Sequence, residues 1–397
     1  MRGDGGDGRR VMRRVGIGAA VGFAATIGVV TALGMLAIVT RFARTVVVPA
    51  LTTDEPARIL GVDIRAGTIT FAVDDKTAVP GRYSFWFDGG DGHARIGEIL
   101  SDDGSSVTRR VLAVDFGDLA AATRGRLGSW YFLGPWEFGL PYDDVTVETD
   151  LGPAPAWVIP AAEPDGRWVV MVHGWSGRRS ECLRAIPAFH AAGYTCLVIS
   201  YRNDGEAPES ADGRYGLGDT EWSDVANAMA FAAGRGAQRI VLAGWSMGGA
   251  IALQAALRPE LAASISGLVL DSPAVDWHDV LAFQGALKRL PEPITRGVVE
   301  TLGSGWGRGI SGLATPIDFD RLNVLARADE LVTPTLILHS VDDGFVPHAG
   351  SAELAELRPD LVTYSEWSGA RHARLWNFDP DRWDRTVGAW LAALDAE

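Results

Sequence analysis

From Tyr142 to the C-terminus, short apolar runs alternate with helical stretches, and this alternation restricts the possible folds more than any other feature of the chain. Because strand–helix alternation places successive strands side by side with helices over both faces, it predicts a mostly parallel sheet flanked by helices. We therefore expect a single α/β domain over residues 142–397. Eight apolar runs suit its buried strands: VTVET, AWVIP, RWVVMVH, TCLVISY, RIVLAG, GLVLDS, PTLILHS and LVTYSEW.

Residues 58–141 have a different pattern. Short β-type segments such as TITFAV, RYSFWF, ARIGEIL and TRRVLAVDF are separated by turn signals such as DGGDGH and SDDGSS. The first stretch with any helical period is FGDLAAATRGRL. We expect a small β-rich module here, without a catalytic constellation of its own.

The N-terminal region contains a run of 26 residues without a charged side chain, from Val15 to Thr40. As a helix this run would span roughly 39 Å, which exceeds the hydrocarbon core of about 30 Å. We expect a basic cytoplasmic tail at residues 1–14, a transmembrane signal-anchor helix at 15–40 and a linker at 41–57, with the rest of the chain outside the cytoplasm. A cleaved signal peptide and a buried helix are the alternative interpretations. The orientation rests on the excess of arginine before the run (Arg9, Arg10, Arg13 and Arg14) over arginine after it (Arg41 and Arg44).

Charge and cysteine content exclude several classes of function. The formal net charge of −14 argues against a nucleic-acid partner, because such binding depends on basic residues that neutralise phosphates. Cys182 and Cys196 are the two cysteines, which is too few for a cysteine-based metal site and leaves a single disulfide open. We expect no cofactor and no metal.

The three letters GWS occur twice, each time after an apolar run, with serines at positions 176 and 246. Ser246 lies between a strand-like run and a helical stretch, with Gly244 two residues before it and Gly248 two residues after it. Small residues at these positions allow a nucleophilic serine to project from a sharp strand-to-helix turn. Ser176 has Arg178 at the second position, so we interpret it as a loop residue and Ser246 as the nucleophile.

A serine nucleophile needs a base and an orienting acid. His372 follows the last strand-like run in a loop before the final helix, so it is the expected base, with His348 as the next candidate. Asp342 and Asp343 follow the preceding strand-like run, and either is a candidate acid. The chain order serine, aspartate, histidine is typical of one arrangement of this catalytic triad.

Four segments in this order resemble the α/β-hydrolase superfamily, especially its bacterial esterase-like and acyl-peptidase-like serine hydrolases: His173–Gly177, Gly244–Gly249, His339–Pro347 and Gly369–His372. The resemblance implies an α/β-hydrolase fold over residues 142–397 and selects Asp343 as the acid. It also implies that the backbone amides of Trp175 and Met247 form an oxyanion hole.

Residues 273–333 separate two strand-like runs by more chain than one helix requires, and we expect them to form a helical cap over Ser246. Trp277, Phe283 and Trp306 are candidate walls of an apolar substrate pocket. The sequence thus predicts a membrane-anchored, carboxylesterase-like serine hydrolase acting on a small-molecule ester or thioester. A serine peptidase acting on small peptides is the alternative, and an inactive scaffold is the third hypothesis.

Overall fold

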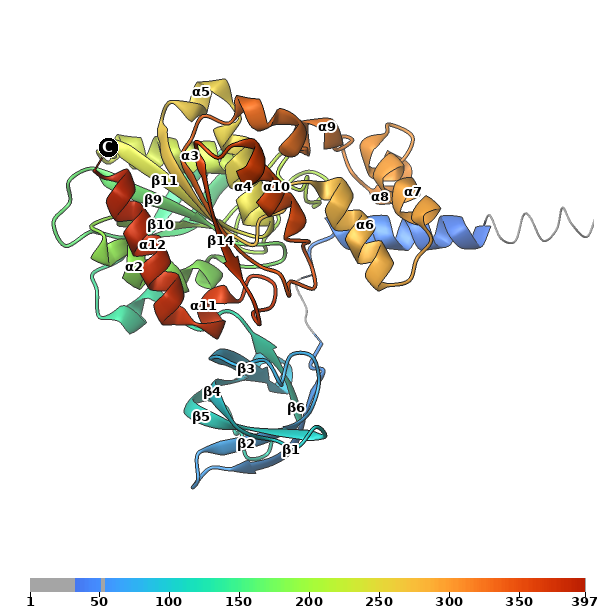
Figure 1. The fold of residues 1–397 in the computed structure, drawn as a ribbon, viewed down its shortest axis with the longest axis vertical. Helices are drawn as coiled ribbons and strands as arrows, with labels where there is room; N and C mark the ends of the chain where they lie inside the picture. Colours follow the sequence, from blue (N-terminus) through green and yellow to red (C-terminus); the bar gives the residue numbers. More distant parts are fainter. Residues whose placement is uncertain (1–32, 51–53, 397) are drawn as a thin grey trace, which may run out of the picture.

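The computed structural model describes residues 33–50 and 54–396 of the chain. These residues form a helix at the N-terminal side, a β-barrel and an α/β domain (Figure 1). The predicted cytoplasmic tail and residues 15–32 of the predicted anchor lie outside the described residues.

An eight-stranded sheet is the centre of the α/β domain, with the strand order β14-β13-β12-β11-β9-β10-β8-β7. The pairs from β14 to β10 are parallel, whereas β8 runs antiparallel to β10 and to β7. All eight predicted strands are present: β7 (Asp143–Thr149), β8 (Gly152–Ile159), β9 (Arg167–Val172), β10 (Thr195–Ile199), β11 (Arg239–Trp245), β12 (Ile265–Asp271), β13 (Thr335–Ser340) and β14 (Val362–Trp367).

Helices cover both faces of this sheet, as the alternation predicts. Along β9, Val170 and Val172 face a core shared with α3 and α4, whereas Val169 and Met171 face a core shared with α2 and α12. This alternation explains why the strand is apolar throughout, since both of its faces are buried. The helices outside the cap are α2 (Ile186–Ala191), α3 (Trp222–Gly234), α4 (Met247–Ala256), α5 (Pro259–Ala262), α10 (Ala349–Leu357), α11 (Leu375–Phe378) and α12 (Pro380–Leu394), with 3₁₀ turn η3 (Arg179–Ala185).

The predicted cap is helical and projects from the sheet between β12 and β13 (Figure 1). Its two long helices pack against each other, and their apolar side chains join the core of the α/β domain. The cap comprises α6 (Trp277–Leu287), α7 (Glu292–Gly303), α8 (Arg308–Ser311), α9 (Phe319–Leu322) and 3₁₀ turn η4 (Leu325–Glu330).

Residues 33–47 are helical, and we call them the N-terminal helix. This helix lies beside α6 and α7 (Figure 1), with Val39, Phe42, Ala43 and Val47 buried in the same apolar core as the cap. The predicted linker at 41–57 is therefore wrong over its first seven residues, because a buried apolar stripe at helical spacing continues into it. Among the described residues, no helix has both the length and the apolar character needed to cross a membrane.

The β-rich module is a closed six-stranded barrel with the order β1-β2-β5-β4-β3-β6. The stretch FGDLAAATRGRL, which has a weak helical period, forms turns followed by β6, because its apolar residues Leu119, Ala122 and Leu127 fill the barrel interior. The elements of this part of the chain are β1 (Ala57–Asp63), β2 (Thr68–Ala72), β3 (Tyr83–Phe87), η1 (Asp88–Gly90), β4 (Gly92–Asp102), β5 (Ser106–Phe116), β6 (Arg124–Gly128) and, after the barrel, η2 (Pro135–Phe138).

Asn377 of α11 joins the barrel to the α/β domain. Its Nδ2 donates to the carbonyl oxygens of Arg82 and Ser129, and its Oδ1 accepts from Arg184. Because Asn377 is fully buried and uses both ends of its amide, it fixes the barrel next to the loop that carries His372.

Candidate functional site

Ser246 lies on the turn between β11 and α4, as its flanking glycines predict. Its backbone has φ 54° and ψ −116°, a conformation that is strained for a residue with a side chain. The side chain is nearly buried, with 7% of the residue exposed. The turn thus holds a single hydroxyl at the C-terminal edge of the sheet, where ligands bind in open α/β folds.

The glycines on either side of Ser246 are required by close backbone contacts. A Cβ atom at Gly244 would lie 2.4 Å from the carbonyl oxygen of Gly248. A Cβ atom at Gly248 would lie 2.1 Å from the carbonyl oxygen of Val172, at the end of β9. The turn is therefore packed directly against the strand that leads into the first GWS segment.

The structure brings Ser246, His372 and Asp343 together in a hydrogen-bonded chain. His372 Nε2 is 2.8 Å from Ser246 Oγ, and His372 Nδ1 is 2.7 Å from Asp343 Oδ2. His372 lies in the loop between β14 and α11, and Asp343 lies just after β13. Three loops at the same edge of the sheet therefore supply the three side chains.

Asp343 has further partners that favour its charged form. Its Oδ1 accepts hydrogen bonds from the amides of Phe345 and Val346, at 2.8 and 2.9 Å, and His339 Nε2 lies 3.1 Å from its Oδ2. Burial acts to raise the pKa of Asp343, but the charge of His372 and the hydrogen bonds from both histidines outweigh it and hold the pKa well below its usual value. His339 was included in the sequence motif without a role, and the structure shows that it holds the carboxylate.

The two alternative residues take other positions. Asp342 turns away from His372 and accepts a hydrogen bond from the amide of Gly369 at 2.6 Å. His348 precedes α10, and its ring lies 6.5 Å from that of His339. Neither one contacts Ser246 or His372.

Two backbone amides lie beside Ser246 without an acceptor. Met247 is the first residue of α4, so its amide is one of those that a helix leaves unpaired, and Trp175 follows β9 in the loop that approaches Ser246. Neither amide donates to any acceptor in the described part of the chain. A Cβ atom at Gly174 would lie 3.3 Å from the Cβ of Ser246, which shows how closely this loop passes the serine.

Buried polar side chains hold the Trp175 loop in place. The Gly174 amide donates to Glu181 Oε2 at 2.9 Å, and His173 Nε2 lies 3.1 Å from Asp204 Oδ2. The Tyr201 hydroxyl donates to the carbonyl oxygen of Gly174 at 3.0 Å, and its ring stacks on that of His173. Because each of these groups is buried and paired, the loop has little freedom to move away from Ser246.

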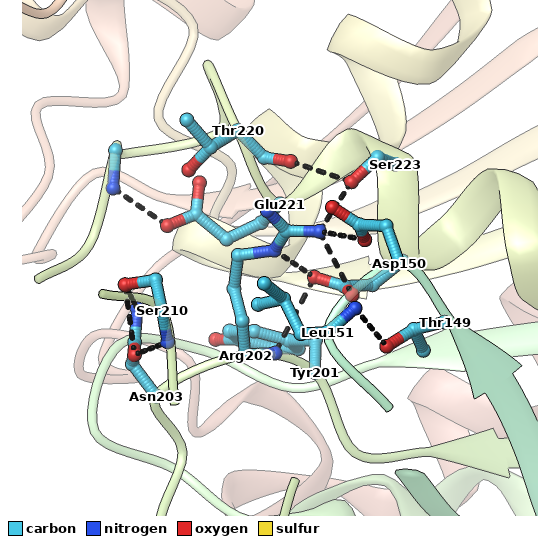
Figure 2. Close-up of polar contacts among 12 residues, drawn as sticks. Thr149, Asp150, Leu151, Tyr201, Arg202, Asn203, Ser210, Thr220, Glu221 and Ser223 are labelled. Carbon is cyan, nitrogen blue, oxygen red and sulfur yellow. Dashed lines mark hydrogen bonds and ion pairs between the residues drawn. The ribbon is translucent and has the colours of Figure 1, made fainter. Parts of the chain in front are cut away.

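Figure 2 shows the polar contacts of Arg202, which follows Tyr201 in the chain and precedes Asp204 by two residues. Arg202 Nη2 donates to Asp150 at 2.6 Å and to Ser223 Oγ at 2.5 Å, and its Nε donates to Asp224 at 2.7 Å. Arg202 thereby ties this segment to α3 and to the turn between β7 and β8. The network acts on the site through the Trp175 loop and does not touch Ser246.

The first GWS segment also contacts the N-terminal helix. Trp175 Nε1 donates to the carbonyl oxygen of Val46 at 2.9 Å, and Ser176 Oγ accepts from the amide of Ala50 at 2.8 Å. The Ser176 side chain therefore binds the chain that follows the helix, in agreement with its interpretation as a loop residue.

A small apolar cavity of about 140 Å³ opens at Ser246. Trp277 lines it as predicted, but Phe283 and Trp306 do not, and Trp306 is 62% exposed. The helical period of the cap decides this difference, since α6 presents to the cavity the face that carries Trp277, Val280, Leu281 and Gln284, and Lys288 follows directly after the helix. The remaining lining residues are Phe42, Thr45, Val46, Trp175, Phe345 and Val346.

The barrel contains a second hydrogen-bonded chain of the same residue types. His93 Nδ1 is 2.8 Å from Asp115 Oδ2, and His93 Nε2 is 2.8 Å from Ser84 Oγ. Ser84 and His93 are fully buried, and burial lowers the pKa of His93. Since no substrate can reach a buried serine, we assign this chain to the packing of the barrel.

The comparison with family models identifies both folded parts. Residues 169–391 match the model of the alpha/beta hydrolase family, which is more than half of the chain, and the chain therefore belongs to this family. Residues 58–128 match a family described as a domain of unknown function (DUF8805), and they coincide with the barrel strands from β1 to β6.

A solved esterase has a similar fold. Two crystal forms of the Pyrococcus furiosus esterase Pf2001 match with a TM-score of 0.51, at 20% and 22% sequence identity. Each match covers 66% of this chain, and 96% and 94% of the esterase chain respectively. Est1E from Butyrivibrio proteoclasticus has 17% identity and a TM-score of 0.49, over 64% of this chain and 99% of its own. At these identities the similarity to the Pyrococcus furiosus esterase concerns the fold alone.

Proposed function

We propose that the protein is a serine hydrolase that cleaves an ester or thioester through an acyl-enzyme on Ser246. The observation that carries this proposal is the hydrogen-bonded chain from Ser246 through His372 to Asp343, with 2.8 and 2.7 Å between the atoms. A serine hydroxyl in contact with an imidazole that is oriented by a carboxylate is the arrangement that activates serine for acyl transfer.

The mechanism follows from this geometry. His372 Nε2 takes the proton of Ser246 Oγ as the oxygen attacks the substrate carbonyl, and Asp343 stabilises the imidazolium that forms. The unpaired amides of Trp175 and Met247 receive the negative charge on the carbonyl oxygen. The imidazolium gives its proton to the leaving alcohol or thiol, and water then attacks the acyl-enzyme with His372 again as the base.

The lining of the cavity favours an ester or thioester over a peptide with a free amino terminus. A charged α-amino group requires a carboxylate partner, and the described residues that line the cavity at Ser246 include no acidic side chain. The alternative hypothesis, a serine peptidase acting on small peptides, would instead require turnover of aminoacyl amides in preference to acyl esters.

Labelling with a fluorophosphonate probe tests the proposed nucleophile, with Ser176→Ala as the matched control. We expect Ser246→Ala to lose labelling and to lower ester hydrolysis on the order of a million-fold, whereas Ser176→Ala keeps both. A folded wild-type protein that neither reacts with the probe nor hydrolyses any ester would favour the scaffold hypothesis.

We further propose a membrane anchor with the catalytic domain outside the cytoplasm. The uncharged run from Val15 to Thr40 supports it, as do the exposed apolar side chains at the start of the N-terminal helix: Leu33, Met35, Leu36 and Ile38. The embedded part would end before Val39, because Val39 packs against the cap. Protease treatment of a C-terminal tag in intact cells and in inverted vesicles tests this topology. A tag that is protected from protease in intact cells and accessible in inverted vesicles lies in the cytoplasm and would contradict the proposal.

A further inference from the structure

We propose that the N-terminal helix forms one wall of the acyl pocket, so that Phe42, Thr45 and Val46 select the acyl group of the substrate. This inference rests on the proposed acyl-enzyme at Ser246. It assigns substrate selection to residues that lie about two hundred positions before the nucleophile and outside the part of the chain that matches the alpha/beta hydrolase family.

The helix supplies three of the residues that line the cavity. Phe42, Thr45 and Val46 lie at positions i, i+3 and i+4, so they share one face of the helix. The other lining residues come from α6, from Trp175 and Ser246, and from the pair Phe345 and Val346, whose amides hold Asp343. Three of the residues that line the cavity therefore belong to the helix.

Hydrogen bonds fix this wall to the catalytic domain. The carbonyl oxygen of Val46 accepts from Trp175 Nε1 at 2.9 Å, and the carbonyl oxygen of Val47 accepts from the amide of Tyr215 at 2.9 Å. Arg44 Nε donates to the carbonyl oxygen of Ile310 in α8 at 2.8 Å. The wall is thus tied both to the loop of Trp175 and to the cap.

Phe42 closes the cavity at the end formed by the cap. The residue is only 7% exposed, and Lys288 Nζ lies 4.8 Å from the centre of its ring, a cation–π contact. The amide of Gln284 is engaged with the carbonyl oxygen of Phe345 at 2.7 Å. The side-chain amide of Gln284 is therefore occupied by a backbone oxygen, whereas the indole nitrogen of Trp277 has no hydrogen-bond partner among the described residues. Most of the remaining lining side chains are apolar, so the interior accepts an apolar group.

The volume of about 140 Å³ defines the size of that group. An apolar cavity of about 150 Å³ holds a molecule the size of benzene, which is about six heavy atoms. We therefore assign a short straight-chain acyl group, with an optimum between butanoyl and hexanoyl.

Hydrolysis of two series of esters tests the wall. The first series varies the acyl group from acetyl to decanoyl on 4-nitrophenol, and the second varies the alcohol of an acetate ester. We expect Phe42→Ala to shift the acyl optimum to octanoyl or longer and Phe42→Trp to shift it towards acetyl. In each variant, the ratio of kcat/KM for the newly preferred acyl ester to kcat/KM for the ester that the wild type prefers should change by at least about 10-fold. Leu36→Ala, on the exposed side of the same helix, should leave both series unchanged.

Val46→Ala provides an independent test if Phe42→Ala fails to fold. We expect Val46→Ala also to favour longer acyl groups. Unchanged acyl profiles in folded Phe42 and Val46 variants would overturn the proposal, and so would a shift confined to the alcohol series. Failure of the proposed function has a different signature, namely a wild-type protein without ester hydrolysis or a Ser246→Ala variant with full activity.

Discussion

The indole nitrogen of Trp175 donates a hydrogen bond to the carbonyl oxygen of Val46, at a distance of 2.9 Å. This bond connects the loop that passes Ser246 to the N-terminal helix, so one residue presents its amide to the proposed oxyanion site and its side chain to the helix. The position of the helix and the geometry of the site are therefore linked through a single residue.

Trp175→Phe separates the two roles of this residue. The backbone amide remains, so we expect fluorophosphonate labelling of Ser246 to persist, while loss of the bond to Val46 lowers the free energy of unfolding by about 1 kcal/mol. Thermal denaturation with and without the probe measures both effects. An unlabelled variant with an unchanged melting temperature would show that the indole itself takes part in the chemistry.

Asp343→Asn and Asp342→Asn form a matched pair of neighbours. Because the Asp343 carboxylate accepts from His372 at 2.7 Å, its amide would favour the wrong tautomer of the imidazole, and we expect kcat to fall about 10⁴-fold. The side chain of Asp342 accepts from the amide of Gly369 and is not bonded to His372, so its variant should keep kcat within a few-fold of wild type. Steady-state kinetics on one ester measures both, and equal losses would contradict the assignment of the acid.

Gly248→Ala should destabilise the catalytic turn. The added methyl group would meet the carbonyl oxygen of Val172 at 2.1 Å, so the turn or the end of β9 must move, at a cost of about 3 kcal/mol or more. Gly388→Ala is the control, since nothing lies within 4 Å of the new methyl group. Because Gly388 lies in the interior of α12, Gly388→Ala should instead raise the free energy of unfolding by about 0.5–1 kcal/mol. Urea denaturation measures the change in the free energy of unfolding, which should be negative for Gly248→Ala and positive for Gly388→Ala.

Asp384 on α12 predicts a pH dependence of stability. Burial raises the pKa of this carboxyl to about 6, and the nearby charge of Asp381 acts in the same direction. A raised pKa in the folded state means that the contribution of Asp384 to stability is present below its unfolded pKa of about 4 and is lost as the pH rises through about 6.

Asp384→Asn should therefore raise the free energy of unfolding above pH 6, by about 1 kcal/mol after allowance for the partial solvent exposure of the site. Below pH 4 the variant should have no advantage, since the carboxyl is then neutral in both states. Melting temperatures across this pH range test the prediction, and a gain independent of pH would show that burial of charge is not its cause.

The order of the strands along the chain and the strand-to-helix turn at Ser246 could be predicted from the sequence, because both depend on neighbouring residues. Apolar runs of strand length indicate the sheet, and the glycines at positions 244 and 248 indicate a turn in which side chains would collide. His372 was also identifiable, because few histidines follow the serine and only this one lies in a loop after the last strand.

Tertiary structure decided the features that depend on residues distant in the chain. No local pattern shows that Asp343 is held by His339 as well as by His372, or that Phe42 and Val46 reach a cavity at Ser246, about two hundred residues later. Apolar residues at helical spacing signal only that a face is buried, not what buries it. The N-terminal helix became part of the site because the cap presents an apolar face to it and the Trp175 indole binds its backbone, and both conditions exist only after the chain has folded.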